Sequence, residues 1–150
     1  MTTKTRDGIA IKRLLEVCGI AADAGRGEAF GKFVTRLRGI PESSRKLLAH
    51  VADLAYREHH DGRKPGAAYL PELHETCGLG VDEMYELLKQ LEQGEFIRVE
   101  GEYPFQDVVL KSVPLPESEW ALMQDLWRFC KAEQISLREL VADLNFDRLA

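Results

Sequence analysis

The segment from Ala68 to Val113 constrains the fold more than any other, because its hydrophobic period changes in a fixed order between clear breaks. A short apolar run and a short helical run lead to Gly78. A longer amphipathic run follows Gly80 and ends at Gly94, and two strand-like runs come after it. Since helices and strands differ in the spacing of their apolar residues, we predict the order strand, helix, turn, helix, strand, strand.

The longest element of this segment is predicted to be an amphipathic helix between Gly80 and Gly94. Its apolar residues recur three and four positions apart, as on the core-facing side of a helix. The residues predicted to face the core are Val81, Met84, Leu87, Leu88 and Leu91. Before this helix, Pro71 suits the first turn of a shorter helix, which Gly78 should end with a positive φ.

Three strands are predicted, at residues 68–70, 96–100 and 107–113. The sequence GEYPFQ lies between the last two strands, and Pro104 within it argues against a tight two-residue hairpin. We therefore expect a longer and looser loop at this place.

This order of elements resembles the winged helix-turn-helix, over about residues 41–113. The resemblance rests on pattern and spacing, since no residue has a chemical role that only this fold would require. It implies a fold that is mainly α with a small antiparallel β-sheet. It also implies that the third helix enters the major groove of DNA and that the loop, or wing, meets the DNA backbone.

Helical segments are predicted on both sides of this core. Residues 1–40 would form a basic helical extension and residues 114–150 a C-terminal helical pair, in one compact unit with the core or in a dimer. The core itself would begin with a helix that is capped by Ser43 or Ser44 and that runs to about His59.

The C-terminal pair carries two signals. Trp120 and Trp127 share one helical face of residues 117–134, which suits burial against the N-terminal helices or a homodimer interface. Ser136, with Glu139 three positions later, is a capping-box pattern that predicts the start of a last helix.

The net charge of −5 is unevenly distributed along the chain. The first 46 residues hold ten basic and five acidic residues, a net charge of +5, so the remaining residues together carry −10. If the chain contacts phosphate groups, this basic third is the better candidate.

The outward face of the longer predicted helix has the opposite character, with four carboxylates and one cation, Lys89. Duplex DNA carries about one phosphate charge per 1.7 Å of its axis, so these acids oppose the attraction that usually drives binding. Phosphate contacts from the basic third, or from a second copy in a dimer, could compensate. A further interpretation is that the acidic face is simply solvated.

Two functions are therefore predicted. The first is a DNA-associated or transcription-regulatory role, as the resemblance implies. Its candidate phosphate contacts are Arg36, Arg38, Arg45, Lys46, Arg63 and Lys64, and its possible readers of adenine edges are Gln90 and Gln93. The alternative is a protein-interaction module without DNA binding, in which an aromatic anchor among acids meets a basic protein partner. Its candidate residues are Asp82, Glu83, Tyr85 and Glu86.

Other classes of function have less support from the sequence. The sequence contains no nucleophile elbow and no dinucleotide fingerprint, so we expect neither an enzyme nor a cofactor. His74 and Cys77 could share a metal with His59 and His60, but an exposed histidine and a core cysteine are favoured. The three widely spaced cysteines are interpreted as reduced thiols. No apolar run approaches the roughly 20 residues that span a bilayer, so we expect a cytoplasmic protein without membrane contact.

Overall fold

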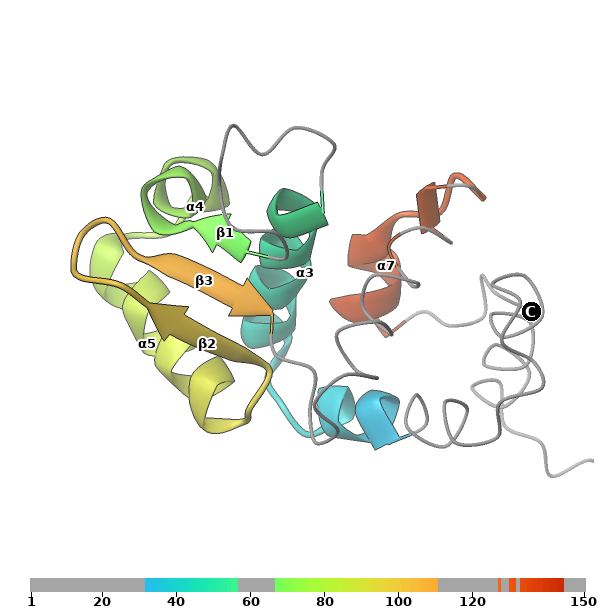
Figure 1. The fold of residues 1–150 in the computed structure, drawn as a ribbon. Helices are drawn as coiled ribbons and strands as arrows, with labels where there is room; N and C mark the ends of the chain where they lie inside the picture. Colours follow the sequence, from blue (N-terminus) through green and yellow to red (C-terminus); the bar gives the residue numbers. More distant parts are fainter. Residues whose placement is uncertain (1–31, 57–66, 111–126, 128–129, 132, 145–150) are drawn as a thin grey trace, which may run out of the picture.

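The structure is a computed structural model of the chain, and it describes residues 32–56, 67–110, 127, 130–131 and 133–144. The fold is mainly α with a small antiparallel sheet of three strands (Figure 1), which confirms the predicted fold class. The order of the elements is compatible with a winged-helix layout.

The described elements follow one another as the sequence predicted. They are, in chain order, helical residues 32–38, α3 (Glu42–Tyr56), β1 (Ala67–Tyr69), α4 (Leu70–Cys77), α5 (Val81–Gln93), β2 (Ile97–Glu100), β3 (Asp107–Leu110) and α7 (Leu137–Val141). Residues 1–31 of the predicted basic helical extension and most of the predicted helix at 117–134 lie outside the described residues.

The sheet has β3 at its centre, with β1 and β2 antiparallel on either side. Val108 of β3 stands opposite Ala68 of β1 and opposite Val99 of β2, and it is fully buried. Residues 101–106 connect β2 to β3 in a loop longer than two residues, as Pro104 predicted. This loop lies at the end of the sheet that is farther from α7 (Figure 1).

Helix α3 is the centre of the molecule, because it lies between the sheet and α7 (Figure 1) and contacts both. One apolar core joins residues of the N-terminal segment, the sheet, the helices and α7. The largest fully buried side chains of this core are Leu37, Leu48, Leu73, Met84, Leu88, Leu91 and Ile97. Trp127 packs at its edge, 6.1 Å from Tyr56 between ring centroids, so this tryptophan lies against α3. Trp120 lies outside the described residues.

Several of the predicted signals at the ends of helices are confirmed. Pro71 occupies the first turn of α4, and Gly78 ends that helix at a φ of 76°. Gly80 is the N-cap of α5. At α7, the Ser136 side chain accepts a hydrogen bond from the backbone N–H of Glu139 at 3.4 Å, as in a capping box.

Two local predictions are wrong. Helix α3 starts at Glu42, so Ser43 and Ser44 lie in its first turn rather than before it. Val81 is 41% exposed in the first turn of α5, although it lies only about 20° around the helix from the buried Leu88. The end of α5 agrees with the prediction, since Gly94 is its C-cap, and the backbone then turns through Glu95, which has a φ of 63°.

Candidate functional site

Arg36, one of the predicted phosphate contacts, is used within the fold. Its guanidinium donates a hydrogen bond to the carbonyl oxygen of Gly94 at the end of α5. The same group lies over the ring of Phe96, with its central carbon 4.4 Å from the ring centroid. A guanidinium stacked on an aromatic ring and bonded to a carbonyl holds the turn from α5 to β2 in place.

Arg45 is also used within the fold. Its Nε donates to the carbonyl oxygen of Ala142 at 2.9 Å, after the end of α7. Its Nη1 donates to the carbonyl oxygens of Ile40 at 2.6 Å and Leu37 at 3.4 Å. Carbonyl oxygens at helix ends lack hydrogen-bond donors inside their own helix, and Arg45 supplies these donors from a neighbouring helix.

Of the other predicted phosphate contacts, two lie within the described residues. Arg38 is exposed after the buried Leu37, and Lys46 is exposed on α3 with its Nζ 3.3 Å from Glu42. Arg63 and Lys64 lie outside the described residues.

The two predicted base readers differ in their surroundings. Gln90 accepts a hydrogen bond at its Oε1 from Oγ of the fully buried Ser44 at 3.1 Å, which turns its side chain toward α3. Gln93 is exposed at the end of α5.

The exposed side of α5 has two flanks with different surroundings. With about 100° of rotation per residue, Val81 and Tyr85 fall on one flank, and Glu83 and Gln90 fall on the other. The contact of Gln90 with α3 identifies the second flank as the one toward α3. Asp82 lies about 60° from Tyr85, whereas Glu83 lies about 160° from it. Glu83 therefore lies on the flank toward α3, whereas Asp82 lies nearer to Tyr85.

Tyr85 is a half-buried residue that joins α5 to the loop 101–106. Its hydroxyl donates to Oε1 of Gln106 at 3.1 Å, and its ring centroid is 5.8 Å from that of Tyr103. Burial raises the pKa of the Tyr85 phenol, and the neighbouring Tyr103 adds to this shift. The phenol thus keeps its proton near neutral pH, as its donor role requires.

Two aromatic residues that the sequence reasoning missed stand out in the loop. Tyr103 is 68% exposed and Phe105 is 67% exposed. Large apolar side chains this exposed are informative when they gather at one place. The sequence did contain a signal of their exposure, since the six-residue loop GEYPFQ holds two aromatic residues and is too short to bury both.

We use the name acidic–aromatic face for the surface formed by this loop and the exposed side of α5 outside the flank that carries Glu83 and Gln90. Its members are Val81, Asp82, Tyr85 and Glu86 of α5, with Glu102, Tyr103 and Phe105 of the loop. The face carries three carboxylates, and Lys89, one turn after Tyr85, is the nearest cation along α5. It combines exposed rings with an excess of negative charge.

The described residues contain no group of three or more His, Cys, Asp or Glu side chains that could hold a metal ion. His59 and His60, which the metal hypothesis needed, lie outside the described residues. Cys77 and Cys130 are free thiols. None of the helices that the structure describes is long and apolar enough to cross a membrane.

Comparisons of the chain with known protein families, with curated proteins and with solved structures find no match.

Proposed function

We propose that the chain is a protein-interaction module whose acidic–aromatic face binds a basic segment of a partner protein. The observation that carries this proposal is the exposure of Tyr103 and Phe105 in a loop that contacts the acidic helix α5 through Tyr85. Aromatic anchors dominate binding energies at protein interfaces, and they are effective when a polar rim surrounds them.

The charge of the face indicates the chemistry of the partner. Asp82 and Glu86 are exposed on α5, and Glu102 is next to Tyr103 in the loop, while Lys89 is the nearest cation along α5. Such a surface attracts lysine and arginine side chains and repels acidic partners. Guanidinium and ammonium groups also bind the faces of aromatic rings, which adds to the attraction when the rings and the acids lie together.

A DNA-associated role stays the competing prediction. The winged-helix relationship that we infer for residues 41–113, from the element order and the strand order β1-β3-β2, supports it. The contacts within the fold argue against this role, because they already engage the side chains of Arg36, Arg45 and Gln90. A duplex would also have to approach the acids of α5.

The proposal is tested with a library of random twelve-residue peptides displayed on phage and selected on the full chain at an ionic strength of about 0.15 M. We expect the enriched peptides to contain lysine or arginine together with a large apolar residue. The double variant Tyr103→Ser, Phe105→Ser should weaken binding of such a peptide by about tenfold or more, as expected for hot-spot residues.

Two neighbouring residues of α5 provide a matched pair of charge variants. Asp82→Lys changes the acidic–aromatic face, whereas Glu83→Lys makes the same change of charge on the opposite flank, also in the first turn. We expect Asp82→Lys to weaken peptide binding and Glu83→Lys to leave it nearly unchanged. A library without basic peptides, or equal effects of the two variants, would contradict the proposed face.

The DNA prediction is tested in parallel by fluorescence anisotropy with a random duplex, at low salt and again near 200 mM salt. Tight binding with a steep salt dependence would favour the DNA role. Arg38→Glu is then the informative variant, because Arg38 is exposed while Arg36 also holds the turn after α5.

A further inference from the structure

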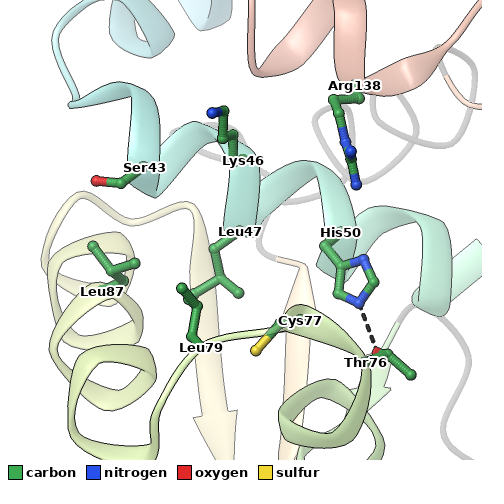
Figure 2. A pocket seen from close by; sticks show the side chains of 9 residues that line it. All are labelled: Ser43, Lys46, Leu47, His50, Thr76, Cys77, Leu79, Leu87 and Arg138. Atoms are coloured by element: carbon green, nitrogen blue, oxygen red, sulfur yellow. Dashed lines mark hydrogen bonds between the residues drawn. The ribbon is translucent and has the colours of Figure 1, made fainter.

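A cavity of about 270 Å³ lies where α3, the end of α4, α5 and α7 meet (Figure 2). Its volume is near the lower end of the roughly 300–1,000 Å³ of small-molecule sites, so it suits a small ligand. The cavity is separate from the acidic–aromatic face, because its α5 residue, Leu87, lies on the side of that helix toward α3. Its walls divide into an apolar and a polar part.

The apolar part consists of Leu47, Leu79 and Leu87, from α3, the turn between α4 and α5, and α5. Leu47 and Leu87 belong to the core and are almost fully buried, and the partly buried Leu79 packs against them. These three side chains form a fixed apolar surface, because they are held by the core on their other sides.

The polar part begins with His50, whose ring is held in one orientation. Oγ1 of Thr76 donates its only proton to the carbonyl oxygen of Glu72 at 2.9 Å. The 2.7 Å contact between Oγ1 and Nε2 of His50 must therefore use a proton on Nε2. In the neutral ring Nδ1 is then without a proton, and Nδ1 lies on the side of the ring turned toward Arg138 (Figure 2).

Arg138 extends from α7 toward His50 and brings a permanent positive charge to the cavity (Figure 2). Lys46 also lines the cavity, but its amino group lies 3.3 Å from Glu42, and Figure 2 shows it turned away from His50. The two groups that point toward each other across the polar end are therefore Arg138 and His50.

We propose that this cavity binds a small organic acid, with its carboxylate between Arg138 and protonated His50 and its apolar body against the three leucines. A guanidinium matches the planar, two-oxygen geometry of a carboxylate. The second oxygen would accept from Nδ1 of His50 once that nitrogen carries a proton. This inference does not rest on the proposed protein-interaction function.

The charges around His50 make the binding dependent on pH. Burial lowers the pKa of His50, Arg138 lowers it as well, and Asp53 on α3 and Glu72 on α4 act in the opposite direction. The ring is thus neutral near pH 7 without a ligand. A bound carboxylate favours the imidazolium, so binding takes up a proton and strengthens as the pH falls toward the range in which free His50 protonates.

The test uses phenylacetate and its neutral, similarly shaped amide, phenylacetamide, in titration calorimetry with the full chain at an ionic strength of about 0.15 M. We expect phenylacetate to bind saturably, about tenfold or more tighter than the amide, and to bind more tightly at pH 6 than at pH 8. Repeating the titration in buffers of different ionisation enthalpy should reveal the uptake of a proton.

Three variants locate the site. Arg138→Gln should weaken phenylacetate binding by about tenfold or more, because Arg138 provides the permanent charge. His50→Gln keeps an N–H for Thr76 but cannot take up a proton, so it should remove the proton uptake and the pH dependence. Arg98→Gln, which removes an exposed arginine of β2 paired with Glu100, should change neither property.

The proposal is overturned if the parent chain does not bind phenylacetate, or if it binds the acid and the amide equally. It is also overturned if Arg98→Gln weakens binding as much as Arg138→Gln, since the attraction would then depend on overall charge. Thermal unfolding of each variant confirms that its fold is intact. Inorganic phosphate serves as a second probe, and binding as tight as that of phenylacetate would contradict a role for the leucines.

Discussion

At the scale of single residues, the basic side chains of the N-terminal segment show why composition is a weak guide to a binding surface. Arg36 and Arg45 are counted in the net charge like any exposed arginine, yet each bonds backbone carbonyls within the fold. Gly39 and Pro41 mark in the sequence the end of the helix at residues 32–38. They could not predict which distant side chain would satisfy its last carbonyls.

Replacing Arg45 with methionine should lower the free energy of unfolding by about 2–3 kcal/mol, because hydrogen bonds that involve a charged group contribute about 1.5–3 kcal/mol. Methionine keeps a long apolar side chain, so the loss reports mainly the bonds to the carbonyls of Leu37, Ile40 and Ala142. Urea denaturation measures the change.

The neighbouring exposed residue provides the control for this variant. Lys46→Met removes the same charge and a solvent-exposed pair with Glu42, so its effect should stay within about 0.5 kcal/mol. Equal losses in the two variants would show that Arg45 acts through its charge alone.

At the scale of elements, hydrophobic spacing predicted which helices and strands form and in what order. It was less informative about their ends. Val81 continues the apolar spacing of α5 but is exposed, and Ser44 resembles a cap but lies buried within α3. Spacing reports the average face of a helix, whereas the state of a residue in the first turn depends on what lies beside that turn.

The turn between α4 and α5 can be tested at Gly78, which has a φ of 76°. A Cβ added there would meet nothing within 4 Å, so a substitution acts through the backbone alone. Gly78→Ala should lower stability by about 1–2 kcal/mol, the cost of the left-handed conformation for a residue with a Cβ.

Gly78→Asn is the matched comparison, because asparagine adopts this conformation more readily than alanine does. We expect a smaller loss of stability for Asn than for Ala in thermal or urea unfolding. Equal losses would indicate that the turn depends on the absence of a side chain and not on φ.

The sequence was informative about the candidate site in part. It identified the acids of α5 and Tyr85, since charge and helical spacing can both be read directly. It predicted Tyr85 as an aromatic anchor among acids, and the structure shows that its ring also packs against Tyr103 while its hydroxyl donates to Gln106. Spacing within α5 cannot reveal that the loop 101–106 folds back toward the helix, and the more exposed aromatic residues of the face are in this loop.

At the scale of the whole molecule, packing on α3 gives the global stability a dependence on pH through His50. Burial is the largest cause of the lowered pKa of His50 in the folded chain. The folded state then binds fewer protons than the unfolded state between this lowered pKa and the unfolded value of about 6.5. The contribution of His50 to stability is therefore present above about pH 6.5 and is lost as the pH falls through this window.

Asp53, one turn later on α3, has the opposite effect on how stability changes with pH. Burial raises the pKa of its carboxyl, so the folded state favours the protonated form, and stability gains from Asp53 as the pH falls. To isolate His50, we compare urea denaturation of the parent and of His50→Gln at about pH 7.5 and about pH 5.5. The parent should lose more stability on acidification than the variant does. A variant that loses as much as the parent would exclude His50 as the source.

The position of α3 between the sheet and α7 also has a consequence for how the chain is made. About 80 residues separate the end of α3 from the start of α7. All of them must be synthesised before the carbonyl of Ala142 can accept a hydrogen bond from Arg45. At about 5–20 residues per second, a ribosome needs roughly 4–16 seconds to synthesise that interval. During this time one side of α3 is without its native cover, so the nascent chain offers chaperones an apolar helix that the finished molecule conceals.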